Sequence, residues 1–369
     1  MRILHTEAST GWGGQEIRIL KESLGMRARG HEVFILAGPD SQLLKRARQE
    51  CLHTDIIQFR RRDFSGIFTR VKRYIETKQI EVVNTHSSKD SWLILPAARL
   101  ARTRPLAVRT RHLSTPIGRN PLSSLLYNCL PHIVITTGEA IRTQMIEVNK
   151  FNPVRIMSIP TGVDLEAFDP SLTFQNLRDE LGLGHSIPLI GTVSVIRSWK
   201  GLDYLVKALP LIMKEIPEAR LVITGEGPHR PVLEKTIEST GTGKNVFLLG
   251  HREDIVPILS SIDVMVQPSY ANEGVPQTIL QALAMKKPVI ASDLLPFREV
   301  IRDGETGMLV PVRDSDCIAQ AVIKALGDRD FSRRLGESGR RLVETSYSFT
   351  GMLDRLELLY GSYQRKEAF

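Results

Sequence analysis

The chain has 369 residues, of which 42% are hydrophobic and 24% are charged, a balance typical of globular proteins that dissolve in water. This length exceeds what one ordinary core accommodates, so two domains are expected. No apolar run reaches the roughly 18 residues that a membrane-spanning helix needs, and the first residues lack the pattern of a secretory signal peptide. The three cysteines are far apart and fit no metal or redox spacing. We therefore expect a protein of the reducing cytoplasm.

The net charge of +8 is unevenly distributed along the chain. Residues 1–150 carry 24 Lys and Arg against 13 Asp and Glu, whereas the remaining residues carry 25 against 28. A basic first half predicts an anionic partner on that side, either a membrane surface or a substrate. Its densest cluster, residues 60–62, is equally consistent with a solvated loop. We find neither zinc-finger spacing nor interleaved aromatic and basic residues, so nucleic acid is not an expected partner.

Strands and helices are expected to alternate through the first half. The expected strands are 2–5, 32–37, 56–59, 81–85, 106–109 and 133–136, and the expected helices are 15–29, 66–77, 90–101, 122–129 and 139–147. Gly13 and Gly14 lie in the first turn, where glycine lets a backbone approach a ligand closely. Polar residues such as His86 and His112 follow later strands. Open parallel sheets bind ligands at these carboxyl ends, so a cleft is expected there.

A second alternation begins after turn-forming residues between 160 and 170. Its expected strands are 187–194, 220–224, 246–249, 263–267, 288–291 and 308–310, and its expected helices are 202–216, 229–239, 254–261, 273–285, 315–344 and 350–364. We predict an α/β protein with a first domain over 1–163, a second over 164–349, and a terminal helix over 350–369 that returns to the first domain.

The second half contains a candidate anion site. Arg197 and Lys200 follow its first expected strand, and Gly225 and Gly227 follow the next one. The helix expected to begin at Glu273 would offer free N–H groups, which favour an anion. Two cations beside such a helix start suit a pyrophosphate. A lone glutamate at this position would more often simply cap the helix.

Several segments, in order along the chain, resemble the retaining glycosyltransferases of family 4. The segment EGVPQTILQALAMKKPVIAS is similar to the signature element of that family, and GWGGQEIRILKESLGMRARGHEV is similar to its N-terminal loop and helix. The segment VRIMSIPTGVDLEAF resembles the interdomain crossing, and RSWKG, TGEGPHR and VFLLGHRED resemble successive strand ends of the second domain. The resemblance covers nearly the whole chain. It implies the GT-B architecture, in which two Rossmann-like doubly wound domains face each other across a cleft.

The resemblance also implies roles for individual residues. His112 would lie near the anomeric carbon of the sugar, and Glu273 would bind sugar hydroxyls. Gln281 stands where the family has a second Glu that holds the ribose, about 12 Å from Glu273 if all eight intervening steps are helical. The donor-binding residues implied are Gly13, Gly14, Arg197, Lys200, Gly225, Gly227, Arg252, Glu273, Gly274, Val275, Gln277, Thr278 and Gln281.

The implied function is transfer of a sugar, with retention and without a bound metal or cofactor, from a UDP- or GDP-linked donor. The basic first half suggests that the protein docks peripherally at an anionic membrane face, where the acceptor would be a lipid-linked or lipopolysaccharide-type glycan. Two departures from the family pattern stand out, because Gln281 replaces a carboxylate and the family's usual arginine position is occupied by Val195. Two alternatives remain open, namely a catalytically silent nucleotide-sugar-binding protein and a GT-B nucleotide-sugar epimerase.

Overall fold

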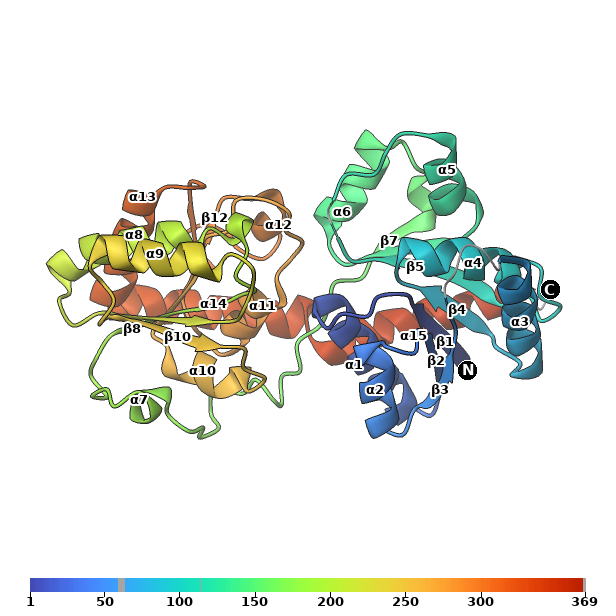
Figure 1. Ribbon diagram of the computed structural model, residues 1–369, viewed down its shortest axis with the longest axis horizontal. Coiled ribbons are helices and arrows are strands. Elements are labelled where there is room, and N and C mark those ends of the chain that lie inside the picture. Colours follow the sequence, from blue (N-terminus) through green and yellow to red (C-terminus); the bar gives the residue numbers. More distant parts are fainter. Residues whose placement is uncertain (59–63, 114, 368–369) are drawn as a thin grey trace. The chain divides into compact units, whose positions relative to one another are not determined.

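The computed structural model describes residues 1–58, 64–113 and 115–367, which form two compact units (Figure 1). Unit 1 comprises Met1–Thr161 together with Thr350–Phe369, and unit 2 comprises Gly162–Phe349. The sequence predicted divisions after residues 163 and 349.

Unit 1 is built on a parallel sheet. Its strands are β1 (Arg2–Glu7), β2 (Glu32–Ala37), β3 (His53–Ile56), β4 (Val82–Thr85), β5 (Leu106–Arg111), β6 (Ile133–Thr136) and β7 (Ile156–Ser158). They lie in the order β3-β2-β1-β4-β5-β6-β7. The order reverses between β1 and β4, so the carboxyl ends of these two strands flank the position where doubly wound sheets bind ligands.

Helices cover both faces of this sheet. They are α1 (Gly14–Ala28), α2 (Gln42–Gln49), α3 (Phe64–Thr77), α4 (Ser88–Arg99), α5 (Pro121–Ser124), η2 (Leu125–Cys129), α6 (Glu139–Thr143), η3 (Gln144–Val148), η4 (Pro153–Arg155) and α15 (Phe349–Glu367). Leu4 and Val83 pack with Ile75 of α3 and Ile94 of α4. The red helix α15 lies beside the blue helix α1 (Figure 1), and its buried Tyr360 donates to Glu22. The last helix therefore contributes to the core of unit 1.

Unit 2 repeats the doubly wound arrangement. Its strands are β8 (Leu189–Val193), β9 (Arg220–Thr224), β10 (Val246–Gly250), β11 (Val264–Gln267), β12 (Val289–Ser292) and β13 (Met308–Val310). Their order is β10-β9-β8-β11-β12-β13, so the reversal lies between β8 and β11. Its helices are α7 (Leu177–Glu180), η5 (Ser198–Lys200), α8 (Leu202–Glu215), α9 (Arg230–Thr240), α10 (Ile255–Ser261), α11 (Gln277–Ala284), α12 (Leu295–Arg298), α13 (Ser315–Gly327) and α14 (Arg329–Ser346). Separate apolar clusters lie on the two faces of the sheet. The predicted α/β class with two doubly wound domains is confirmed.

Several elements differ from the sequence predictions, among them β3, α2 and the start of α11. The strand expected over 56–59 is β3 at 53–56, a largely exposed edge strand whose polar sequence lacks the apolar pattern of a buried strand; residue 59 lies outside the described residues. Helix α2 was not predicted. The helix expected from Glu273 begins at Gln277, because Asn272 adopts a left-handed φ of 55° and Pro276 favours an extended residue before it.

Every helix among the described residues is too short or too polar to span a bilayer.

Candidate functional site

The strand-order reversal of unit 2 brings a cation and a carboxylate together. Lys200 ends the loop after β8, and Glu273 lies in the loop after β11. The Nζ atom of Lys200 lies 2.6 Å from Oε1 of Glu273, and the two side chains are 18% and 7% exposed. The sequence predicted both residues as ligand-binding, although it did not predict that they would bind each other.

A glycine allows the two loops to lie against each other. Gly201 has a φ of 66°, and a Cβ atom there would lie 2.1 Å from the carbonyl oxygen of Pro268. The backbone N–H of Tyr270 donates to the carbonyl oxygen of Trp199 at 2.8 Å. Backbone contacts between the two loops therefore fix the Cα positions from which the side chains of Lys200 and Glu273 extend.

Helix α11 starts four residues after Glu273, so its amino end borders the same loop. The first N–H groups of a helix have no partner within the helix, and they favour an anion. Pro276 has no N–H, so only Val275, Gln277 and Thr278 can donate from the predicted segment 275–278. The side chain of Gln277 donates to the carbonyl oxygen of Gly162 at 3.1 Å, which assigns it a structural contact.

Gln281 lies on α11 and is half-buried. Because Glu273 lies outside α11, the continuous helix assumed in the estimate of about 12 Å between these two residues is not present. The exposed guanidinium of Arg197 lies 5.1 Å from the centre of the Trp199 ring.

Gly225 and Gly227 have an internal packing role. A Cβ atom would lie 1.9 Å from the carbonyl oxygen of Ser194 at Gly225 and 2.2 Å from that of Ile196 at Gly227. These contacts join the loops after β8 and β9. The close approach explains glycine at both positions without a ligand.

Arg252, after β10, is held by two carboxylates. It donates to Glu180 at 2.6 Å and to Asp254 at 2.7 Å, and these hydrogen bonds raise the pKa of Arg252 above its usual value. Its charge is thus already balanced within unit 2.

The strand-order reversal of unit 1 has a different chemistry. The N–H of Gly13 donates to the carboxylate of Glu16 at 2.9 Å, while a Cβ atom at Gly14 would meet nothing within 4 Å. Internal packing therefore does not require glycine at position 14. Burial, reinforced by the nearby carboxyl of Asp90, raises the pKa of Glu7 at the end of β1 to about 7.

Three histidines form a connected row at this edge, with His5 inside β1, His86 directly after β4 and His112 directly after β5. Nε2 of His112 lies 2.9 Å from Nδ1 of His86, and Nε2 of His86 lies 3.0 Å from Nδ1 of His5. Burial, helped by neighbouring cations, lowers the pKa of His86 and of His112 well below the usual histidine value, so both imidazoles are neutral at pH 7. His86 and His112 were candidates from the sequence. His5 was missed, and its only signal was a polar residue inside an apolar strand.

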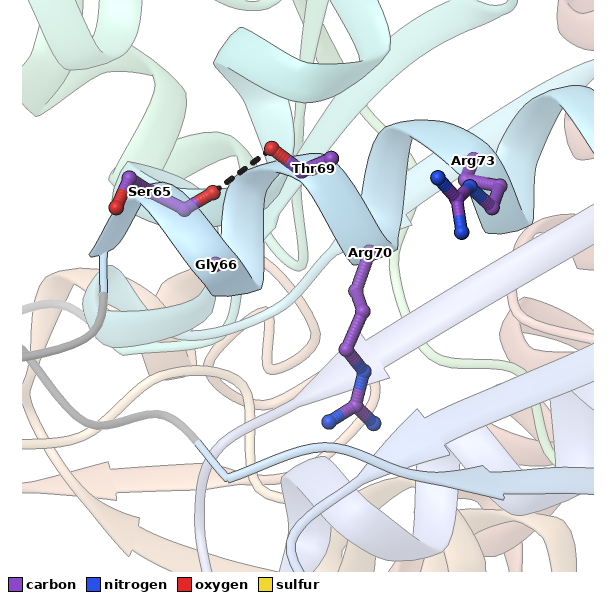
Figure 2. A pocket seen from close by; sticks show the side chains of 5 residues that line it. All are labelled: Ser65, Gly66, Thr69, Arg70 and Arg73. Carbon is purple, nitrogen blue, oxygen red and sulfur yellow. Dashed lines mark hydrogen bonds between the residues drawn. The ribbon is translucent and has the colours of Figure 1, made fainter.

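A separate cavity of about 380 Å³ lies along α3, and Figure 2 shows its lining side chains. They are Ser65, Gly66, Thr69, Arg70 and Arg73. The hydroxyl of Thr69 donates to the carbonyl oxygen of Ser65, and Arg70 donates to the carbonyl oxygen of Ile56. None of the predicted site residues lines this cavity, and the basic cluster 60–62 lies outside the described residues.

Known proteins are similar to this chain in sequence and in fold. The family model described as "Glycosyltransferase Family 4" matches residues 12–167, and the model described as "Glycosyl transferases group 1" matches residues 173–342. Phosphatidyl-myo-inositol mannosyltransferase of Mycobacterium leprae is 27% identical over 343 residues, covering 90% of this chain and 88% of that protein. UDP-Gal:alpha-D-GlcNAc-diphosphoundecaprenol alpha-1,3-galactosyltransferase of Escherichia coli is 27% identical over 301 residues, covering 78% and 77%.

A solved structure extends the likeness to the fold. The crystal structure of Anabaena HepE in complex with UDP superimposes with a TM-score of 0.85 at 19% identity, covering 98% of this chain and all of that one. The two family models together match most of the chain, and both doubly wound units match the solved fold. This chain is therefore a GT-B glycosyltransferase that belongs to glycosyltransferase family 4.

Proposed function

We propose that this protein transfers a sugar, with retention of anomeric configuration, from a UDP- or GDP-sugar to a hydroxyl group of a lipid-linked or lipopolysaccharide-type glycan. The observation that carries the proposal is the Lys200–Glu273 pair at the amino end of α11. The lipid acceptors in the names of the relatives from Mycobacterium leprae and Escherichia coli support a lipid-linked acceptor. The UDP in the Anabaena structure supports a nucleotide-linked donor.

Each group at the unit 2 site has a part in this reaction. A diphosphate would replace Glu273 as the partner of Lys200, because two phosphoryl groups offer more negative charge than one carboxylate. Glu273 would then accept hydrogen bonds from hydroxyls of the sugar. The N–H groups of Gln277 and Thr278 would donate to phosphate oxygens at the helix start. Charge that develops on the departing diphosphate would thus be neutralised without a metal ion.

His112, in unit 1, would act on the sugar of the donor. A neutral imidazole can hydrogen-bond to a sugar hydroxyl beside the anomeric carbon without adding a positive charge there. The acceptor hydroxyl would attack the anomeric carbon on the face that the diphosphate leaves, and the bond to the diphosphate would break as the bond to the acceptor forms. The leaving diphosphate would take the proton of the acceptor hydroxyl.

A donor screen tests the proposal directly. The protein is incubated with UDP- and GDP-sugars and a lipid-linked acceptor, with and without EDTA, and products are identified by mass spectrometry. We expect transfer that EDTA does not reduce, and NMR coupling constants that give product and donor the same anomeric configuration. An inverted product would refute retention, and loss of activity in EDTA would refute metal independence.

Gln281 supports a second candidate function, that of a catalytically silent nucleotide-sugar-binding protein. An amide can accept a hydrogen bond from a ribose hydroxyl, but it lacks the charge that strengthens the bond to a carboxylate. Calorimetric titration with each nucleotide sugar, paired with a donor-hydrolysis assay, separates the two functions. Binding without any turnover would favour the silent protein. Conversion of the donor into its epimer would instead favour an epimerase.

We also propose that the basic first half associates with the anionic cytoplasmic face of a membrane. Residues 1–150 carry 24 Lys and Arg against 13 Asp and Glu, and attraction of such a segment to anionic lipid weakens as salt screens it. Sedimentation with phosphatidylglycerol vesicles should show binding that falls as the salt concentration rises. Equal binding to neutral phosphatidylcholine vesicles would contradict an electrostatic origin.

A further inference from the structure

A buried row of polar side chains connects helix α15 to His112 across unit 1. Tyr360 of α15 donates to Oε1 of Glu22 on α1 at 3.3 Å, and the same carboxylate oxygen lies 3.8 Å from Nε2 of His5. His5 is followed in the row by His86 and then His112, at nitrogen–nitrogen distances of 3.0 and 2.9 Å. All members except His112 are less than 5% exposed. His112, at the end of the row, is partly exposed.

The hydrogen-bonding capacity of imidazole restricts this row to two arrangements. A neutral histidine has one donor nitrogen and one acceptor nitrogen, so each contact between two histidines needs one of each. If Nε2 of His112 carries a proton and donates to His86, then His86 must donate through Nε2 to His5, and His5 must carry its proton on Nε2. The reverse arrangement puts the proton on Nδ1 of all three rings. The tautomers of His5, His86 and His112 therefore change together.

Glu22 distinguishes the two arrangements. In the first, the N–H at Nε2 of His5 points toward the Glu22 carboxylate, and in the second a lone pair does so. Opposing a lone pair to a buried carboxylate is unfavourable because little solvent screens the repulsion. Arg18 lies 3.6 Å from the other carboxylate oxygen of Glu22. Burial lowers the pKa of His5, whereas Glu22 raises this pKa by more than Arg18 lowers it. The first arrangement is thus favoured.

Other contacts keep the row in position. The Asp90 carboxylate accepts a hydrogen bond from the backbone N–H of His86 at 3.0 Å. Asn84 donates to the hydroxyl of Tyr360 at 3.2 Å and accepts from Thr110 at 2.9 Å. Among the described residues, Arg18 and Arg109 are the cations that act on His86, and both disfavour a charged imidazole. The imidazole of His86 is therefore kept neutral within the row.

We propose that Glu22, His5 and His86 are positioning residues that hold His112 as the tautomer protonated on Nε2. Nδ1 of His112 is then an acceptor of hydrogen bonds, and no group among the described residues bonds to it. On the proposed function, on which this role rests, Nδ1 accepts a hydrogen bond from a hydroxyl of the sugar. In the opposite tautomer Nδ1 of His112 would carry a proton and donate, so the sugar hydroxyl would have to accept the hydrogen bond.

Nitrogen NMR of the wild-type protein tests the tautomer without any substrate. The protein is labelled with ¹⁵N-histidine, and long-range proton–nitrogen correlations at pH 7.5 identify the protonated nitrogen of each ring. Single His→Gln variants assign the three signals. We expect Nε2 to carry the proton in His5, His86 and His112. A proton on Nδ1 of His112, or a mixture of the two forms, would overturn the proposal.

Glu22→Gln tests whether the carboxylate sets the tautomer. Because an amide can face His5 with either an oxygen or an N–H, we expect His112 to become a mixture of both tautomers and kcat/KM to fall about tenfold. If the unpaired Arg18 unfolds this variant, Arg18→Gln combined with Glu22→Gln removes both charges together. Glu32→Gln, on a half-exposed carboxylate of the same unit, is the control and should change neither quantity. An unchanged His112 spectrum in folded Glu22 variants would contradict the proposal that Glu22 determines the tautomer of His112.

Two replacements of His86 separate positioning from simple packing. His86→Gln keeps one donor and one acceptor in the row, whereas His86→Leu removes both. We expect His86→Leu to lower kcat more than it raises KM, and His86→Gln to restore most of the loss at equal thermal stability. Equal activity of the two variants would contradict a positioning role. An inactive wild-type protein with the expected tautomers would instead refute the proposed function and leave the tautomer assignment standing.

Discussion

The two units share a strand order but not a chemistry. In each unit the order reverses beside the first strand, between β1 and β4 in unit 1 and between β8 and β11 in unit 2. At this position unit 2 has a close ion pair between Lys200 and Glu273, whereas unit 1 has neutral histidines. The sheet therefore determines where functional side chains gather, and the loops determine which chemistry they supply.

Net charge is a poor guide to these local environments. The first 150 residues are strongly basic, yet the strand-order reversal of unit 1 lies near the buried carboxyl groups of Glu7, Glu22 and Asp90. The remainder of the chain is nearly neutral, yet its reversal has a lysine beside a helix start. Local burial and pairing, more than the charge of a unit, decide what each site can bind.

The strongest test of the comparison removes the ion pair of unit 2. We expect Lys200→Ala and Glu273→Ala each to lower kcat/KM by about 100- to 1,000-fold, because each removes a group that acts on the donor in the transition state. Steady-state kinetics with the donor found by the screen measure the loss. Lys244→Ala, on an exposed lysine of the same unit, is the control and should leave the rate unchanged. Near-normal rates in both site variants would show that the reaction occurs elsewhere.

A second prediction contrasts the glycines of the two units. Gly225→Ala would place a Cβ atom 1.9 Å from a carbonyl oxygen at a φ of 139°, so we expect it to reduce the free energy of unfolding by about 3 kcal/mol. Gly14→Ala meets no atom within 4 Å and should leave stability within about 0.5 kcal/mol. Urea unfolding of both variants measures the difference.

The same pair also tests which glycine meets the donor. We expect Gly14→Ala to raise KM for the donor, since the added methyl group would prevent the donor from lying close to the protein backbone at this position. A Gly14→Ala variant with unchanged KM, or a Gly225→Ala variant with wild-type stability, would contradict this assignment of roles.

Local sequence patterns were sufficient to predict most of the fold. Buried parallel strands have continuous apolar runs, and the strands at 32–37, 133–136, 220–224 and 308–310 begin and end as expected. The prediction based on apolar runs was wrong at β3, because this exposed edge strand has no buried apolar face. It also failed at the start of α11, although Pro276 was visible in the sequence and its preference for an extended neighbour predicts a later start.

The site was less predictable because it depends on contacts distant in sequence. Lys200 and Glu273 were each recognised, but 73 positions separate them and local patterns cannot show that they meet. Glu22 occupies an ordinary helical position, and only the packing of α1 against β1 makes it the neighbour of His5. Arg252 was predicted to bind the donor, whereas the fold provides it with two carboxylates of its own.

The third prediction uses pH to separate the two units. The pKa of Glu7 is raised to about 7, so native unit 1 binds more protons than the unfolded chain between about pH 4.5 and 7, and its stability should fall as pH rises through this range. Burial lowers the pKa of Lys287 to about 8, so unit 2 should gain stability as pH rises from 8 toward 10.5. The two units therefore respond to pH in different ranges and with opposite sign.

Tryptophan fluorescence during urea unfolding can follow each unit by itself. Trp92 lies in unit 1 and Trp199 in unit 2, so variants that retain one tryptophan report on one unit. At pH 8 we expect Glu7→Gln to stabilise unit 1 by about 2 kcal/mol and to leave unit 2 unchanged. Glu50→Gln, on an exposed carboxylate, is the control. A Glu7→Gln variant whose unit 1 keeps the wild-type dependence on pH would contradict the assignment.

The smallest expected effect concerns the ribose end of the donor. Gln281→Glu restores a charged acceptor on α11, and a charge-assisted hydrogen bond exceeds a neutral one by about 1 kcal/mol, which corresponds to about fivefold tighter binding. Calorimetric titration with UDP and GDP measures this change, and Gln281→Met provides the matched loss of the acceptor. If Gln281→Glu weakens binding, then the negative charge repels the diphosphate more than it attracts the ribose. In that case the neutral amide avoids this repulsion, and Gln281 favours binding of the diphosphate.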